Sequence, residues 1–316
     1  MSEQNNDWER GVLEKLAFSA IQEQRRARRW GIFFKLSTFA YITFILVLIT
    51  GWIGGDAGII SGKHTALVEL EGVISEKSPA SADNLIAGLQ AAFSDKNTQG
   101  VVLRINSPGG SPVQAGLVND EIRRLRAIHP TIPLYVVVED ICASGGYYIA
   151  AAADKIFVNK ASIVGSIGVL MDGFGFTGTM NKLGVERRLL TAGENKGFMD
   201  PFSPRNPKHE AFTKAMLGEI HQQFISVVRD GRGKRLKETP ETFSGLFWSG
   251  DKSIKLGLAD EIGSLGSVAR DVIKAEDIVD FTSHEGLADR LAKRFGAGMA
   301  SVLPNFTSQS AGITLR

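Results

Sequence analysis

One stretch of the sequence, residues 134–153, changes from a strand pattern to a helix pattern within a few positions. Residues 134–138 are a short β-branched, apolar run typical of a buried strand, whereas residues 147–153 are rich in helix formers. Ser144 stands at the change, and the two glycines that directly follow it leave backbone amides free to face a ligand. The stretch therefore predicts a strand, a tight turn and a helix. The hydroxyl group at the turn would lie beside amides that stabilise an anion, including the oxyanion of an acyl-transfer intermediate.

Ser144 also has a simpler interpretation. Serine is a favoured residue at the N-terminal cap of a helix, and Ser-Gly-Gly is ordinary turn chemistry, so these residues alone are compatible with a purely structural cap. The nucleophile-elbow motif G-x-S-x-G is not matched, because Cys142 stands where its first glycine should be. Cys142 is the only cysteine of the chain, which excludes an internal disulfide and a cysteine-based zinc site. We expect it to be a small buried apolar residue.

The same rhythm of strand, turn and helix recurs along the chain from residue 64 to residue 282. Such an alternation is typical of an α/β domain with largely parallel strands, in which ligands bind at the carboxyl ends of the strands. Two glycine turns, residues 107–110 and the turn at Ser144, would lie at that edge. The predicted strands are residues 64–72, 100–106, 134–138, 155–159, 162–170, 185–190 and 278–282, and the predicted helices are residues 83–93, 112–128, 147–153, 209–229, 251–257 and 268–274.

Residues 32–53 form an apolar run with a single charge, Lys35. A run of about 20 apolar residues is long enough to cross the hydrocarbon core of a membrane. We expect a transmembrane anchor rather than a cleavable signal peptide, whose apolar region is usually shorter and begins nearer the N-terminus. The four arginines between positions 25 and 29 would place the N-terminus in the cytoplasm and everything after Gly54 across the membrane. They could also form a nucleic-acid-binding arm, but their position directly before the span favours the signal for topology.

These patterns divide the chain into five parts. Within the first part, residues 8–24 have the spacing of an amphipathic helix that lies on a membrane or on a sister chain, or else they form a mobile tail. Within the fourth, the basic residues 231–237 are interpreted as a solvated loop. The parts are a cytoplasmic basic leader (1–31), a transmembrane helix (32–53), a glycine-rich linker (54–63), the α/β domain (64–283), and a C-terminal helix followed by a disordered tail (284–316).

Composition and motifs exclude several classes of function. A formal net charge of +2 gives no general signal for a nucleic-acid partner. The zinc motif H-E-x-x-H, the Walker A motif and the nucleotide turn G-x-G-x-x-G are all missing, so no metal and no cofactor is expected. Any histidine could complete a Ser-His-Asp triad in space, but no motif places one, and each is expected to be a surface residue or a satisfied core residue. The five histidines are at positions 64, 129, 209, 221 and 284.

Five motifs in this order and spacing resemble the signal peptide peptidase SppA family, in its short, single-repeat, membrane-anchored form. The resemblance covers about residues 64 to 282 and implies a Clp protease/crotonase-like fold, a spiral of ββα units. The motifs are Asn-Ser-Pro-Gly-Gly at 106–110, Ala-Ser-Gly-Gly-Tyr-Tyr-Ile-Ala at 143–150, Gly-Ser-Ile-Gly-Val at 165–169, Lys196 ahead of Pro201, and Trp-Ser-Gly-Asp at 248–251 with Gly-Leu-Ala-Asp-Glu-Ile-Gly at 257–263.

The resemblance implies a role for each residue of a serine-lysine peptidase site. Ser144 would be the nucleophile, Lys196 the general base and Ser166 the hydroxyl that orients the lysine. The amides of Gly110 and Gly145 would form the oxyanion hole. A lysine in water has a pKa of about 10.4, so a lysine base works at neutral pH only where burial in an apolar pocket has removed its water. From local sequence alone, Lys196 would be interpreted as a solvated loop residue.

The resemblance also implies an assembly, a substrate and a location. In double-length relatives the serine and the lysine belong to different repeats, so a single-repeat chain would bring Ser144 of one subunit to Lys196 of its neighbour in a ring, expected to be a homo-octamer. The implied substrates are signal peptides and other hydrophobic peptides. The implied location is a bacterial inner membrane, with the catalytic domain on its outer side and lipid as a further partner.

Two other functions stay open from the sequence. A crotonase-like acyl-thioester enzyme would use the same oxyanion geometry without a serine-lysine pair. A non-catalytic membrane scaffold with a degenerate protease fold would need neither side chain, and the presence of both Ser144 and Lys196 argues against it.

Overall fold

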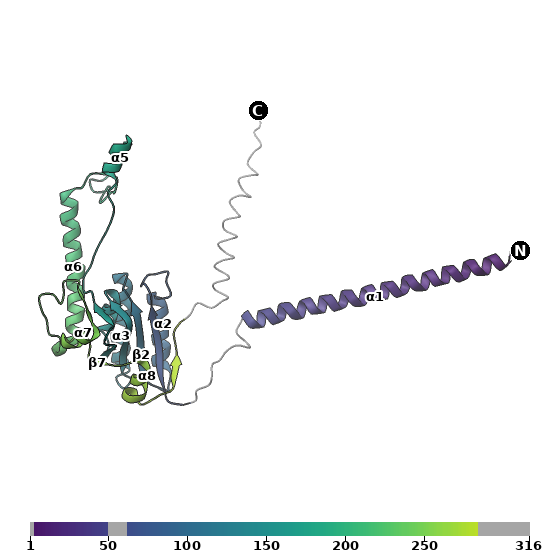
Figure 1. Cartoon of the computed structure of the whole chain (residues 1–316), viewed down its shortest axis with the longest axis horizontal. Coiled ribbons are helices and arrows are strands. Elements are labelled where there is room, and N and C mark those ends of the chain that lie inside the picture. The colour runs from purple at the N-terminus through teal and green to yellow at the C-terminus, as the bar shows by residue number, and fades with distance from the viewer. Residues whose placement is uncertain (1–2, 50–61, 284–316) are drawn as a thin grey trace. The chain divides into compact units, whose positions relative to one another are not determined.

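The computed structural model describes residues 3–49 and 62–283 (Figure 1). The chain divides into two compact units. Among the described residues, the first unit contains the N-terminal helix α1, Glu3–Ile49, and the second contains residues 62–283. The predicted linker, residues 54–63, and the predicted C-terminal helix and tail lie almost wholly outside the described residues.

Helix α1 is continuous over 47 residues, so the predicted leader helix and most of the predicted span belong to one helix. Its segment Ile21–Val47 is long and apolar enough to cross a membrane. Large apolar side chains of this segment are exposed, as Phe39 is at 71%. Burial of such side chains in lipid would remove them from water. Residues 50–53, the end of the predicted span, lie outside the described residues.

The second unit is built on one sheet, which contains eight strands in the described part of the chain. The strands are β1 (His64–Glu71), β2 (Thr98–Ser107), β3 (Leu134–Ala143), β4 (Lys155–Val158), β5 (Ile163–Gly165), β6 (Phe247–Ser249), β7 (Glu261–Ile262) and β8 (Ile278–Asp280). The helices of this unit are α2 (Ala82–Ser94), α3 (Pro112–Ile128), α4 (Gly145–Ala150), α5 (Thr177–Leu183), α6 (Pro207–Arg232), α7 (Gly250–Lys255) and α8 (Leu265–Ser267), with a 3₁₀ turn at Gly233–Arg235 and a π-helical segment at Val268–Ile273.

The order of the strands is β6-β5-β3-β2-β1-β8, and β4 and β7 continue from β3 on a branch of the sheet. All pairs are parallel except β5 with β6. Parallel neighbours need crossover connections, which here are helices α2 and α3 between the first three strands. The predicted α/β domain with largely parallel strands is confirmed.

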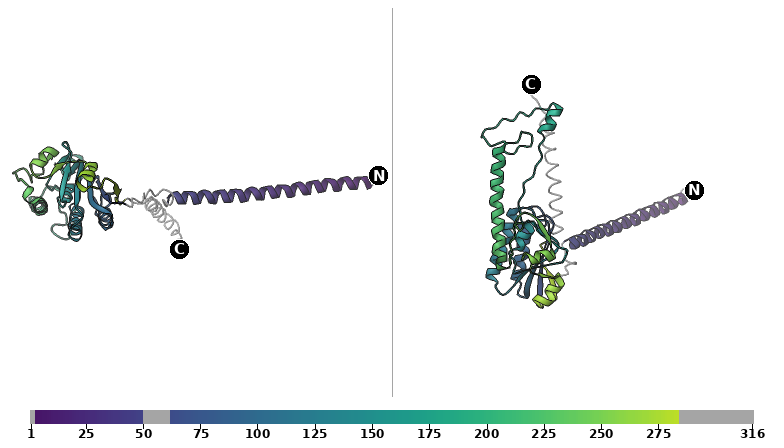
Figure 2. Two further views of the ribbon diagram at one scale, coloured as in Figure 1. Left: turned by 90° about the horizontal axis from the view of Figure 1, so that it is seen from below. Right: turned by 60° about the vertical axis from the view of Figure 1, so that its left-hand side comes forward.

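Alternating side chains of the strands face two different layers. In β2, Leu103 belongs to the main core, where helices α2, α3, α4 and α6 cover the sheet (Figure 2). Its neighbour Val102 belongs to a smaller cluster with Phe157 and Val268, next to the π-helical segment. The strands are therefore apolar on both faces where both are covered, which is why they read as continuous apolar runs in the sequence.

Two predicted elements are corrected. The predicted strand at residues 185–190 is wrong, because these residues are exposed and pair with no strand that the structure describes. A β-branched, apolar run forms a strand only where the backbone of another strand pairs with it, and no strand that the structure describes lies beside this segment. The strand predicted at 162–170 ends at Gly165, where the chain turns with a positive φ of 118°.

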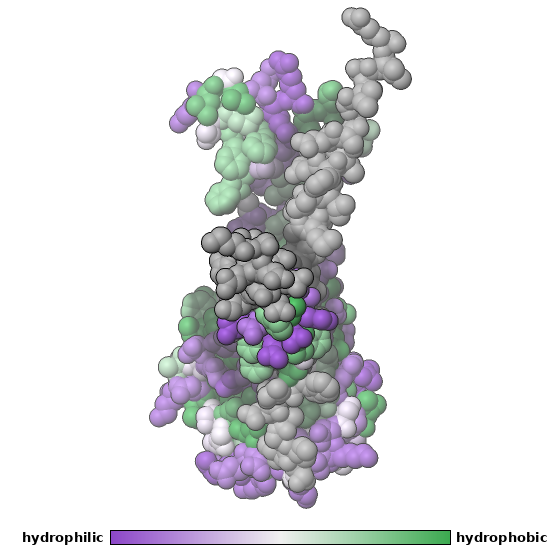
Figure 3. Space-filling model, turned by 90° about the vertical axis from the view of Figure 1, so that its right-hand side faces the viewer, coloured by the Kyte–Doolittle hydropathy of each residue, from purple (hydrophilic) through white to green (hydrophobic). Residues whose placement is uncertain are grey.

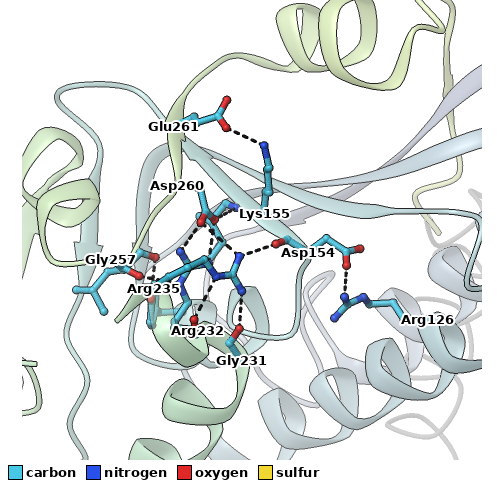
Figure 4. A network of polar contacts seen from close by, with 12 residues as sticks. Arg126, Asp154, Lys155, Gly231, Arg232, Arg235, Gly257, Asp260 and Glu261 are labelled. Atoms are coloured by element: carbon cyan, nitrogen blue, oxygen red, sulfur yellow. Dashed lines mark hydrogen bonds and ion pairs between the residues drawn. The ribbon is translucent and has the colours of Figure 1, made fainter. Parts of the chain in front are cut away.

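The basic segment 231–237 is not simply a solvated loop. Arg232 lies at the end of α6 with its side chain fully buried, and it binds both carboxylate oxygens of Asp260 at 2.8 and 2.9 Å (Figure 4). Its Nε donates to the carbonyl oxygen of Gly257, and the amide of Ile156 donates to Asp260. Arg235 lies beside this pair and bonds to the carbonyl oxygen of Asp154. These bonds connect the end of α6, the start of β4 and the segment before β7.

The pKa of Asp260 is set by opposing effects. Burial acts to raise the pKa, but the hydrogen bonds and the positive charge of Arg232 outweigh it, and the pKa lies below its ordinary value. The carboxylate is thus favoured in its charged form. A carboxyl group whose pKa is lowered by folding stabilises the folded state at pH values above its pKa in the unfolded chain. This stabilisation is lost as the pH falls through its pKa in the folded chain.

We predict that Asp260→Asn lowers the free energy of unfolding by about 3–5 kcal/mol at neutral pH, because it leaves the buried charge of Arg232 without a partner. The measurement is urea unfolding of the full chain in detergent. The matched control is Glu261→Gln, which breaks the neighbouring pair of Lys155 and Glu261, whose side chains are 44% and 53% exposed. That change should cost less than about 1 kcal/mol. Equal effects of the two changes would contradict the prediction.

Candidate functional site

Ser144 lies between β3 and α4 in a backbone conformation that is rare for a residue with a side chain. Its φ is 52° and its ψ is −122°. Such a conformation costs about 1–3 kcal/mol and persists only where the surroundings hold it. The Ser144 amide donates to the carbonyl oxygen of Gly165 at 2.9 Å, and the Ser144 carbonyl accepts from the amide of Tyr148 at 2.9 Å. The strand on one side and the helix on the other therefore fix the turn.

The hydroxyl group of Ser144 does not cap helix α4. At Ser81, Ser111 and Ser249 the side-chain oxygen accepts a hydrogen bond from a backbone amide of the helix that follows. Ser144 makes no such bond. The interpretation of Ser144 as a helix cap is thus wrong.

A second turn, after β2, packs directly against Ser144. The carbonyl oxygen of Gly109 accepts from the amide of Ile74 at 2.9 Å, and Gly109 has a φ of 98°. A Cβ atom at Gly109 would lie 2.7 Å from the Ser144 Cβ and 2.7 Å from the Gly145 amide nitrogen. Only glycine fits this contact, since no real Cβ atom approaches other atoms so closely.

Two backbone amides, those of Gly110 and Gly145, lie near one another beside Ser144. The Gly110 nitrogen lies 3.3 Å from the position that a Cβ atom on Gly145 would occupy. Gly145 is the first residue of α4, where an amide has no acceptor within its own helix. Among the described residues, neither amide has a backbone carbonyl as partner. Such a pair of amides is able to hold a negatively charged oxygen.

These groups open into one cavity of about 510 Å³. Ser144, Ser166, Gly110 and Gly145 all line it. One wall is apolar: it includes Tyr148 and Phe224, whose rings pack with centroids 5.1 Å apart. The remaining lining residues are Pro108, Pro112, Ala115, Gly168, Val169, Leu170, Ile220, Gln223, Ser244 and Gly245.

Ser166 follows β5 and shares the unusual backbone of Ser144, with a φ of 52°. Its amide donates to the carbonyl oxygen of Leu246 at 2.7 Å, and its carbonyl accepts from the amide of Gly168 at 3.0 Å. The structure thus brings four of the five predicted site residues to one cavity.

Lys196, the fifth predicted site residue, lies elsewhere. It is exposed and does not line the cavity. It belongs to an extension, defined as residues 169–206, which includes α5. The extension stands away from the sheet beside the first turns of α6 (Figures 1 and 2). No residue of the extension is buried, and Leu170, Phe174 and Leu190 are 81%, 79% and 95% exposed. Figure 3 shows apolar residues at the surface of this upper part of the unit.

Sequence reasoning missed the apolar wall of the cavity and the support of its glycine turn. Phe224 and Ile220 come from the middle of a long helix, and their spacing matches that of core residues, so no local signal distinguishes them. Ser107 is fully buried, accepts from the Gly109 amide and donates to the carbonyl oxygen of Gly72 at 2.6 Å. Its position in a Ser-Pro-Gly-Gly turn was a usable signal.

The four described histidines behave as expected, as satisfied residues, and none lines the cavity. The ring of His129 packs at a tilt against Phe93, and that of His209 packs at a tilt against Phe198, with ring centroids 5.6 and 4.8 Å apart. The remaining two are His64, which bonds to the carbonyl oxygen of Gly62, and His221, which bonds to that of Ile167.

Comparison with known proteins gives consistent matches over this unit. A profile of peptidase family S49 matches residues 126–278. A protein of Methanocaldococcus jannaschii that is provisionally named a protease is 32% identical over 219 residues, which cover 66% of this chain and 70% of that protein. A protein of Enterococcus faecium provisionally named signal peptide peptidase SppA is 28% identical over 230 residues, which cover 70% of this chain and 66% of that protein.

A third relative carries a different name. The Na+/H+ antiporter NhaA of Brucella melitensis biotype 1 is 44% identical over 220 residues, which cover 68% of this chain but 29% of the antiporter. The chain thus spans less than a third of the length of this relative. The name describes a much longer protein, and it assigns no transport activity to the shared segment.

We predict that Gly109→Ala lowers the free energy of unfolding by at least about 1–3 kcal/mol, because alanine is strained at a φ of 98° and its Cβ would collide with Ser144. The measurement is urea unfolding of the full chain in detergent. The control is Gly116→Ala in α3, where a Cβ atom meets nothing within 4 Å. Alanine favours a helix by about 1 kcal/mol over glycine, so this control should be neutral or stabilising. A Gly109→Ala chain as stable as the control would contradict the prediction.

Proposed function

Since the chain belongs to peptidase family S49, we propose that it is a membrane-anchored serine peptidase with Ser144 as its nucleophile. One observation carries the proposal. The Ser144 hydroxyl does not cap helix α4, it stands on a strained turn, and it lies near the amides of Gly110 and Gly145. A nucleophile and an oxyanion site in one cavity are the two parts that acyl transfer requires.

We assign the general base to Lys196 of a neighbouring subunit. Within one chain Lys196 is exposed and does not reach the cavity lining. The extension that carries it also exposes apolar side chains such as Phe174 and Leu190, and exposed apolar surface of this kind marks a contact with another protein. Packing of the extension on a second copy would bury the apolar side chains and take water from the lysine. A ring of subunits, a homo-octamer, would give each Ser144 a lysine.

The proposed reaction proceeds in two acyl transfers. The neutral Lys196 amine accepts the proton of the Ser144 hydroxyl while the Ser144 Oγ bonds to the carbonyl carbon of the peptide. The amides of Gly110 and Gly145 donate to the oxyanion that forms. The ammonium group of Lys196, oriented by Ser166, then gives its proton to the leaving amine as the peptide bond breaks. Water attacks the acyl-enzyme by the same route and releases Ser144.

The proposed substrates are hydrophobic peptides, chiefly signal peptides that processing leaves in a membrane. The apolar cavity wall formed by Tyr148 and Phe224 suits apolar side chains. The apolar helix segment Ile21–Val47 would hold the unit close to the bilayer, and the arginines before the apolar run would keep the N-terminus in the cytoplasm. The catalytic domain would then lie on the outer side of a bacterial inner membrane, beside its substrates.

We predict that a mixture of Ser144→Ala and Lys196→Ala chains recovers peptidase activity, although each variant alone is inactive. A mixed ring contains interfaces with an intact Ser144 on one chain and an intact Lys196 on the other. The measurement is hydrolysis of a fluorogenic apolar peptide by full chains mixed before assembly in detergent. Random pairing should restore about a quarter of the wild-type rate if each site needs one intact partner from each of two chains.

The control for this experiment is a mixture of Ser144→Ala with a Ser144→Ala/Lys196→Ala double variant, which contains no intact serine. It should stay inactive at the same degree of assembly, measured by size-exclusion chromatography. Assembled mixtures that recover no activity would contradict the shared site.

We also predict that a fluorophosphonate probe labels Ser144 and that Ser144→Ala abolishes the label. A serine acting as nucleophile bonds to the phosphorus atom, whereas the serine of a crotonase-like acyl-thioester enzyme or a scaffold is inert. The measurement is mass spectrometry of the labelled full chain. Ser162→Ala, which removes a buried hydroxyl bonded to the carbonyl oxygen of Glu139, is the control and should keep the label.

A further inference from the structure

Ser166 is held by groups outside its own segment as well as by Gly168. Its φ of 52° places a residue with a side chain in the left-handed region, and such a residue keeps this conformation only where its neighbours hold it. The Leu246 carbonyl oxygen holds the Ser166 amide on one side. Gly168, two residues further on, packs against Gly245, whose Cα would lie 3.0 Å from a Cβ atom at Gly168.

The remaining support comes from helix α6. His221 Nε2 lies 3.1 Å from the carbonyl oxygen of Ile167, the residue directly after Ser166. A carbonyl oxygen only accepts, so Nε2 carries the hydrogen and donates it. Ile167 itself is fully buried, so its side chain and its carbonyl are both anchored. The turn is thereby fixed at Ser166 by one bond and at Ile167 by another.

This turn is connected to Ser144 through the backbone. The carbonyl oxygen of Gly165, the residue before Ser166, accepts the Ser144 amide at 2.9 Å. A shift of the turn would therefore move both hydroxyl groups that face the cavity. His221 is not among the residues that line the cavity, although its neighbours Ile220, Gln223 and Phe224 are.

We propose that His221 is a positioning residue, which holds the Ser166 turn in its active geometry by donating a hydrogen bond from Nε2 to the carbonyl oxygen of Ile167. It does not touch the substrate and transfers no proton. The proposal rests on the proposed function for the consequence of this bond in catalysis, whereas the bond itself is tested separately.

The test compares His221→Gln, His221→Asn and His221→Ala in the full chain in detergent. A glutamine places its amide nitrogen near the position of Nε2, whereas the shorter asparagine places it near Nδ1 and does not reach Ile167. We expect His221→Gln to keep kcat within about twofold, and His221→Asn and His221→Ala to lower kcat about tenfold with an unchanged KM, as loss of one positioning hydrogen bond. The pH profile of kcat/KM should be the same for His221→Gln as for the unchanged chain, since glutamine does not titrate.

Amide hydrogen exchange gives a readout that is independent of activity. The amides of Ser166 and Gly168 donate to the carbonyl oxygens of Leu246 and Ser166. They should exchange faster in His221→Asn and His221→Ala and at the original rate in His221→Gln. The control pair is His129→Gln and His129→Asn, because His129 lies at the end of α3 and its ring packs against Phe93. Neither control should change kcat or exchange in the turn.

Several results would overturn the proposal. A loss above about a hundredfold in all three variants would make His221 a proton-transfer group. Full activity in His221→Asn and His221→Ala would show that the bond is dispensable, and equal losses in all three with faster global unfolding would show a role in folding only. If the unchanged chain hydrolyses no peptide, the proposed function fails, while the exchange rates still decide whether His221 holds the turn.

Discussion

The left-handed backbone at Ser144 is the constraint on which the site depends. A serine in this conformation is disfavoured by about 1–3 kcal/mol, and it keeps its place because every neighbouring group is fixed. The carbonyl oxygen of Gly165 accepts its amide, Gly109 leaves room for its Cβ, and the amide of Tyr148 in α4 donates to its carbonyl oxygen. The result is a serine that lines the cavity and whose hydroxyl group does not cap the helix that follows it.

Parallel pairing explains why three distant turns meet at this point. The register places Ser107 opposite Cys142 and Gly165 opposite Ala143. The segments that follow β2, β3 and β5 therefore leave the sheet at the same edge, each with glycines that let backbones approach closely. The Clp protease-like α/β fold expected from the sequence is confirmed, and with it the position of the glycine turns at the carboxyl ends of the strands.

Local patterns were sufficient where local chemistry decides the structure. Three features could be predicted: the strand-to-helix change at Ser144, the glycine turn after β2 and the apolar N-terminal helix. Each depends on the alternation, the glycine content or the length of one continuous segment of the sequence. Partners that are remote in the chain were not predictable. The local sequence around Arg232 predicts a solvated loop, because it does not show that Asp260 pairs with this arginine. Residues 185–190 have the pattern of a strand, but no strand that the structure describes pairs with them.

Helix α6 connects the extension that carries Lys196 with the cavity that Ser144 lines. Its 26 residues make about 39 Å of helix. It begins directly after the extension, near Phe212, which is 65% exposed, and it ends at the buried Arg232. In its middle, Phe224 forms part of the cavity wall, and His221 bonds to the turn that carries Ser166. A helix is stiff on this length scale, so a contact that fixes its exposed end also restrains the cavity wall. Assembly through the extension would then bring Lys196 to the site of a neighbouring chain. It would also restrain the turns at Ser144 and Ser166 through helix α6.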